Sequence, residues 1–234
     1  MARVRLPPDF LGQLATLRST PIVVGHFFYP MTRLLPDRSI ATVVRDPVER
    51  AISVWEYLHW QTDHHDHQRL VSRDIRTIEQ FAEDDFLAGH VRDNQTRLLG
   101  VEYDVEAIAD ALQAGDLELA DANRLAAESE SVPADAAMLE RAKQRLKRME
   151  VVGITEELAE FVRRLELALG LPPGSPVETD NATPAATVAR RPQAYDESTR
   201  RRLIELNPFD AELHAFAREL RVGEAMRAEG AKDA

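Results

Sequence analysis

The sequence of 234 residues is long enough for one domain, and hydrophobic residues make up 44% of it, which is enough for a packed core. Its formal net charge of -11 argues against non-specific binding to nucleic acid, because nucleic-acid phosphates attract basic proteins. The chain has no cysteine, which excludes disulfides and thiolate metal sites. We expect a single domain over residues 1–220 and a flexible C-terminal tail over residues 221–234.

The sequence gives no sign of a membrane anchor. No apolar run approaches the roughly 20 residues that a membrane-spanning helix requires. The first ten residues, MARVRLPPDF, lack the apolar core of a signal peptide. We therefore expect a cytoplasmic location.

The first predicted elements are a short helix and a strand. Pro8 and a series of leucines at helical spacing indicate a helix within residues 1–20, and residues 22–24 are typical of a strand. His26 follows that strand. A histidine at such a place is commonly a packed structural residue, and it can also act as a general base because its ordinary pKa of about 6.5 lies near neutral pH. The residues alone leave both interpretations open.

The stretch over residues 39–59, SIATVVRDPVERAISVWEYLH, has the pattern of a strand, a tight turn and an amphipathic helix. Its β-branched run predicts a strand covered on both faces. Asp46 can cap the helix, Pro47 suits its first position, and Glu49 would complete a capping-box-like pair. Arg45 then lies at the carboxyl end of a strand and beside a helix N-terminus, where α/β proteins bind anions. The plainer interpretation is a capped turn with an exposed arginine.

Residues 61–72 are polar and rich in histidine. Together with the histidine just before them they could suggest a metal site, but they lack the ordered spacing of known ligand sets. We therefore expect an exposed polar loop and no metal. The histidines concerned are His59, His64, His65 and His67.

Helices are predicted for most of the remaining chain. The first covers residues 75–87, and its inward side chains are predicted to be Ile78, Phe81, Phe86 and Leu87. Residues rich in Ala, Leu, Glu and Arg predict three more helices, over 105–112, 117–127 and 134–149.

Four further segments complete the pattern. Residues 93–99, DNQTRLL, are either an ordinary polar helix start or a helix that faces an active site or its substrate. Residues 151–169 predict a short strand and a helix that Thr155 caps. Residues 172–192 form a connector rich in Pro, Thr and Ala, which ends at Arg190 and Arg191. Residues 198–220 predict two helices around Asn207-Pro-Phe-Asp.

The segment from Arg45 to Ser53, RDPVERAIS, resembles the 3′-phosphate-binding segment of sulfotransferases of the carbohydrate type, most similar to heparan sulfate 2-O-sulfotransferase. The DNQTRLL and VGITE segments and the C-terminal helices are also similar to parts of this family, including its bacterial members. The resemblance implies an α/β, P-loop nucleotide-hydrolase-like three-layer fold with a small parallel sheet and many helices.

The resemblance also implies roles for individual residues. Arg45 and Ser53 match the family's ligands for the 3′-phosphate of the co-substrate 3′-phosphoadenosine 5′-phosphosulfate (PAPS). His26 matches its proposed general base, and Arg190 or Arg191 would reach the nucleotide from the connector. The implied activity is transfer of a sulfuryl group to a hydroxyl of a carbohydrate or similar acceptor, without a metal.

One family element has no counterpart here. The family opens with a strand and a Pro-Lys-x-Gly-(Ser/Thr)-(Ser/Thr) loop that binds the 5′-phosphosulfate, whereas this chain has no lysine before Lys143. The first strand of the sheet is therefore expected to be missing. Three explanations stay open: the start lies too far downstream, the chain is a degraded homologue, or residues 1–20 replace the element. The alternative functions are a module that binds only the nucleotide bisphosphate and a helical interaction protein.

Overall fold

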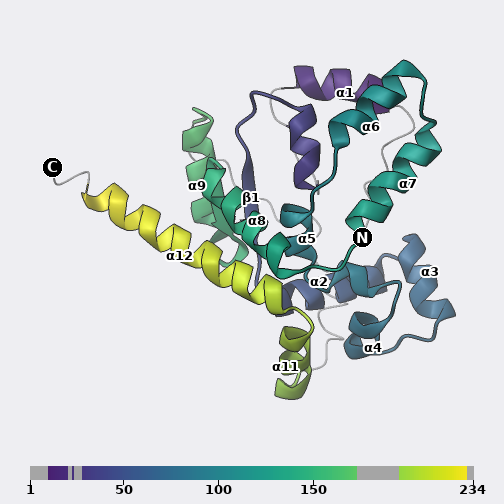
Figure 1. Cartoon of the computed structure of the whole chain (residues 1–234). Coiled ribbons are helices and arrows are strands. Elements are labelled where there is room, and N and C mark those ends of the chain that lie inside the picture. Colours follow the sequence, from purple (N-terminus) through teal and green to yellow (C-terminus); the bar gives the residue numbers. More distant parts are fainter. Residues whose placement is uncertain (1–9, 21–22, 24–27, 173–194, 231–234) are drawn as a thin grey trace. The chain divides into compact units, whose positions relative to one another are not determined.

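The computed structural model describes residues 10–20, 23, 28–172 and 195–230 (Figure 1). These residues are mostly helical, and their one sheet has two parallel strands, which is compatible with the predicted α/β class. The chain divides into two compact units. We call Ala41–Asn94 with Met149–Ala234 the strand unit, and Met1–Ile40 with Gln95–Arg148 the helical unit.

The sheet of the strand unit pairs β1 (Ala41–Val44) with β2 (Val151–Ile154) in parallel. Ala41 lies opposite Val151, and Val44 lies opposite Ile154. All four residues of β2 are buried, whereas in β1 only Val44 is buried. The prediction that β1 is covered on both faces was therefore wrong. It is β2 that is buried on both faces.

Two helices, α9 (Leu158–Ala168) and α12 (Pro208–Gly230), pack on β2. The approach of α9 depends on Gly153 in β2. A Cβ atom on Gly153 would lie 2.4 Å from Cδ2 of Phe161, far inside a normal contact distance. Glycine at this position therefore lets the helix lie close against the strand.

The main core of the strand unit lies among α2 (Pro47–Trp60), α3 (His65–Ser72), α4 (Ile78–Glu83) and α11 (Glu197–Glu205). Its largest fully buried side chains are Leu58, Phe81, Leu87, Val91 and Leu203. The inward positions predicted for Ile78, Phe81 and Leu87 are confirmed.

Two local predictions in this unit were wrong. Residues 61–72 are not an irregular loop, because α3 begins at His65 and the His64 side chain accepts the backbone N–H of Asp66 as its cap. The helix predicted for residues 75–87 ends at Glu83 and is followed by a 3-10 turn, η2 (Ala88–His90). Phe86 consequently lies outside α4 and is 62% exposed, with the Arg73 guanidinium 5.2 Å from its ring centre.

The helical unit contains the helices predicted for it and one further element, the 3-10 helix η1 (Tyr29–Leu34), which was not predicted. The predicted helices are α1 (Phe10–Ser19), α5 (Asn94–Gly100, which begins at the border of the two units), α6 (Val105–Ala114), α7 (Leu119–Glu130) and α8 (Ala136–Arg148). The strand predicted for residues 22–24 lies largely outside the described residues. Arg145 of α8 donates to the carbonyls of Leu99 and Val101, and Arg141 donates to that of Gly100. These two arginines satisfy carbonyls at the end of α5, which its own helix leaves open.

At the C-terminus, α12 runs to Gly230, past the point where the tail was predicted to begin. Among the described residues, no helix combines the length and the apolar character needed to cross a bilayer.

Candidate functional site

The turn between β1 and α2 has the predicted strand-turn-helix form. β1 ends at Val44, and α2 begins at Pro47. The Asp46 carboxylate accepts the backbone N–H groups of Val48 and Glu49, both at 3.0 Å. The prediction of Asp46 as the cap and Pro47 as the first helical residue is therefore confirmed.

Arg45 and Ser53 are the two predicted phosphate ligands that lie within the described residues, and both are half-buried. Arg45 occupies the turn itself. Ser53 lies seven residues after Asp46, about 10 Å along α2, and i and i+7 positions share one side of a helix. The guanidinium of Arg45 and the hydroxyl of Ser53 are both groups that can donate hydrogen bonds to an anion.

The segment after β2 holds this turn in place. The Asp46 backbone N–H donates to Oε1 of Glu156 at 3.2 Å, and the Thr155 hydroxyl lies 3.5 Å from the carbonyl oxygen of Val44. Both groups belong to the 3-10 turn η3 (Thr155–Glu157). The prediction that Thr155 caps α9 was therefore wrong. α9 begins only at Leu158, and the Thr155 hydroxyl faces β1.

Glu156 is ionised beside this turn. Burial alone would raise its pKa, but hydrogen bonds from the backbone N–H groups of Glu156 and Asp46 and the nearby His214 imidazole outweigh that effect and lower the pKa below its ordinary value. Nε2 of His214, on α12, lies 3.4 Å from Oε2 of Glu156. Neither Glu156 nor His214 was predicted as a site residue, although the VGITE segment was recognised as similar to the family.

Glu49 has a different partner from the one predicted. The Asp46 N–H that a capping box would offer to Glu49 goes to Glu156, and Glu49 instead accepts a hydrogen bond from Arg200 of α11. That bond raises the pKa of Arg200. Arg200 thus reaches the first turn of α2, and no sequence signal had singled it out from the arginines beside it.

The DNQTRLL segment starts with two buried residues that join motifs distant in the sequence. Arg50, from the RDPVER motif, donates to the side-chain oxygen of Asn94 and, at 2.6 Å, to the carbonyl of His90. Asp93 accepts the Asp210 N–H at 2.8 Å, and its own N–H donates to the side chain of Asn207 at 2.9 Å. These contacts give Asp93 and Asn94 a structural role, which favours the first of the two interpretations for this part of the segment.

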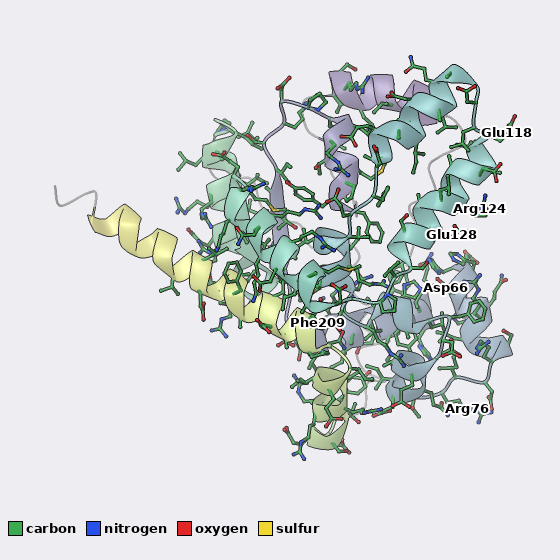
Figure 2. All side chains as sticks on the ribbon, viewed as in Figure 1. Asp66, Arg76, Glu118, Arg124, Glu128 and Phe209 are labelled. Carbon is green, nitrogen blue, oxygen red and sulfur yellow. The ribbon has the colours of Figure 1, made fainter. Side chains whose placement is uncertain are left out.

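A histidine and aspartate cluster lies on α3, where Figure 2 labels Asp66. Ligand atoms of His64, His65 and Asp66 all lie within 4.8 Å of one another, so the cluster could hold a metal ion. Asp66 is 1% exposed, however, and its two oxygens accept from Arg69 at 2.7 Å and His90 at 2.9 Å. The fold itself thus gives this carboxylate partners, one of them a cation, and we assign no metal to it.

Three predicted site residues, His26, Arg190 and Arg191, lie outside the described residues. Arg45 and Ser53 are therefore the predicted site residues that lie within the described part of the chain, and Glu156 contacts the turn that follows Arg45.

Comparison with known proteins identifies two similar sulfotransferases. Heparan-sulfate 6-O-sulfotransferase 2 of Danio rerio is 27% identical over 198 residues, which cover 80% of this chain and 39% of that protein. Heparan-sulfate 6-O-sulfotransferase 2 of Gallus gallus is 26% identical over 196 residues, covering 80% of this chain and 46% of that protein. No protein-family model and no solved structure matches the chain.

The chain thus spans less than half the length of either relative. Both relatives are named for 6-O sulfation, whereas the motifs are most similar to the 2-O type. The comparisons support the family resemblance predicted from the motifs: over 80% of its length the chain is similar, at low identity, to carbohydrate sulfotransferases.

Proposed function

We propose that this chain takes part in sulfuryl transfer from PAPS to a hydroxyl of a carbohydrate, and that Arg45 and Ser53 bind the 3′-phosphate of the nucleotide. The observation that supports the proposal is the strand-turn-helix that contains both residues, in a chain similar to two heparan-sulfate sulfotransferases. A P-loop-like fold and the PAPS co-substrate belong to this proposal.

The chemistry of the two side chains fits a phosphate. Arginine carries a permanent charge and a planar fork of N–H donors that matches phosphate oxygens, and the serine hydroxyl adds a single donor. The backbone N–H groups of Asp46, Val48 and Glu49 already donate to carboxylates of the chain itself. We therefore assign phosphate recognition to the side chains and not to the helix N-terminus.

The transfer step requires a base and a site for the sulfuryl group. A sugar hydroxyl becomes a good nucleophile when its proton is removed as it attacks, and we propose His26 for this task because an imidazole can accept a proton at neutral pH. The attack forms a new oxygen–sulfur bond, breaks the bond from sulfur to the phosphate oxygen, and releases 3′,5′-adenosine bisphosphate. Arg190 and Arg191 are proposed to add positive charge near the nucleotide.

The relatives' names point to heparan-type chains, so we propose a sugar hydroxyl on such a glycan as the acceptor. Transfer is tested by incubating the chain with PAPS and a desulfated heparan oligosaccharide, and by measuring the sulfated product by mass spectrometry. We expect product from the native chain and none from Arg45→Ala. Absence of nucleotide binding in a folded native chain would refute the proposal.

A second function is favoured by one sequence feature. The 234 residues have no lysine before Lys143, and they contain no Pro-Lys-x-Gly loop between Met1 and Arg45. A module that binds the nucleotide bisphosphate without transferring sulfate needs only the 3′-phosphate residues. Tight binding of 3′,5′-adenosine bisphosphate with no product in the transfer assay would establish this second function.

A further inference from the structure

We propose that Glu156 is a positioning residue for the phosphate site: its carboxylate holds the backbone of the β1–α2 turn so that Arg45 faces the nucleotide. This inference rests on the proposed function, because it explains how the Arg45 side chain is presented. It also assigns a role to the VGITE segment, for which the sequence alone predicted none.

The contact that carries the inference is the hydrogen bond from the Asp46 N–H to Oε1 of Glu156, at 3.2 Å. Asp46 directly follows Arg45, so this bond fixes the peptide that leaves Arg45 toward α2. The peptide that enters Arg45 includes the Val44 carbonyl, which faces the Thr155 hydroxyl at 3.5 Å and belongs to the buried end of β1. Two consecutive residues of η3 therefore lie against the two peptides that flank Arg45.

The carboxylate is itself held from the opposite side. His214 of α12 lies 3.4 Å from Oε2 of Glu156, and its side chain is 12% exposed. The next residue, Glu157, pairs with Arg221 of the same helix at 3.0 Å, so η3 is tied to α12 at two successive positions. This support keeps the Oε1 atom near the Asp46 N–H.

The negative charge of Glu156 and its hydrogen bond have opposite effects on phosphate binding, so variants that change only one of them can separate the two. A carboxylate near Arg45 repels a phosphate, while its hydrogen bond keeps Arg45 in position. Glu156→Gln removes the charge and keeps an acceptor oxygen at the same place. Glu156→Asp keeps the charge but is shorter by one methylene, so it loses contact with the Asp46 N–H. Positioning therefore predicts that Glu156→Asp binds more weakly than the native chain, whereas an effect of charge alone predicts native affinity for this variant.

The test combines calorimetric titration with 3′,5′-adenosine bisphosphate and amide hydrogen exchange of Asp46 followed by NMR. We expect Glu156→Asp to weaken binding about fivefold, the equivalent of one ordinary hydrogen bond, and to speed exchange at Asp46. Glu156→Gln should bind at least as tightly as the native chain and keep the exchange slow. Glu160→Asp, which shortens a carboxylate that accepts hydrogen bonds from Arg163 of its own helix, is the matched control and should change neither quantity.

Two results would overturn the inference. One is native affinity in Glu156→Asp together with tighter binding by Glu156→Gln, which would mean that Glu156 acts only as a repelling charge. The other is unchanged exchange at Asp46 in Glu156→Asp, which would mean that the carboxylate does not hold the turn. If the native chain fails to bind the bisphosphate, the proposed function fails, while the exchange measurement still decides whether Glu156 holds the turn.

Discussion

Asp93 joins two segments of the strand unit, and we predict that its replacement by alanine destabilises the protein. Asp93 is 8% exposed and has a φ of 42°, in the left-handed region that alanine tolerates poorly. Its carboxylate accepts the N–H of Asp210 in the first turn of α12 at 2.8 Å, and this N–H has no partner within its own helix. Asp93→Ala removes the acceptor and also strains the backbone.

The two effects give the expected magnitude. Losing a capping acceptor costs about 1 kcal/mol, and placing alanine in the left-handed region costs about 1 kcal/mol more. The free energy of unfolding should therefore fall by about 2 kcal/mol, which corresponds to a midpoint lower by about 4–8 °C for a chain of this size. Asp93→Asn keeps an acceptor oxygen and tolerates positive φ, so it should lose less than half as much.

Urea unfolding followed by tryptophan fluorescence measures this change in the right part of the molecule. The two tryptophans of the chain, Trp55 and Trp60, both lie on α2, in the same unit as Asp93. Asp93→Gly relieves the backbone strain but lacks the acceptor, and it separates the two contributions. Equal stability of Asp93→Ala and the native chain, or equal losses in the alanine and asparagine variants, would refute the reasoning.

Two further predictions concern the same unit. Gly153→Ala should lower the free energy of unfolding by about 1–3 kcal/mol, because its Cβ would lie 2.4 Å from the Phe161 ring in a buried strand; a loss below about 0.5 kcal/mol in urea unfolding would show that α9 moves away without cost. Burial alone would raise the pKa of Asp84, but N–H groups of Leu87 and Phe86 and the Arg73 guanidinium outweigh it and lower the pKa. The stability that Asp84 adds is therefore present above its unfolded-state pKa, near pH 4, and is lost as the pH falls through the lower folded-state value. The stability difference between the native chain and Asp84→Asn should shrink below about pH 4, and a difference that stays constant down to pH 2 would contradict this assignment.

The local pattern of the sequence was sufficient to predict the β1–α2 turn. Asp46 caps α2 and Pro47 opens it because both effects depend on neighbouring residues only. The helices α6, α7 and α8 were predicted for the same reason, since composition and spacing along one segment decide them.

Errors arose where a distant segment competes for a group. The Asp46 N–H has Glu156 as its partner and Glu49 has Arg200, although the sequence predicted a pair between neighbours. Thr155 faces the strand β1 and so does not cap α9. No pattern within one segment reveals such partners, which lie more than 100 residues apart along the chain.

Phe86 shows a second kind of limit. It has the spacing of an inward helical residue, but Asp84 ends α4 by accepting the N–H groups of Phe86 and Leu87, so the helical spacing no longer applies. Its ring instead lies beneath the Arg73 guanidinium. Because Asp84 ends the helix, Leu87 enters the core and the adjacent Phe86 does not.

The most direct test of the proposed phosphate site is calorimetric titration of the chain with 3′,5′-adenosine bisphosphate. Arg45→Ala should weaken binding about 10- to 150-fold, because a hydrogen bond to a charged group is worth about 1.5–3 kcal/mol. Arg76→Ala removes the same charge from a side chain that is 77% exposed and labelled in Figure 2, and it should bind like the native chain. Binding by the native chain that Arg45→Ala leaves unchanged would contradict the assignment of this site.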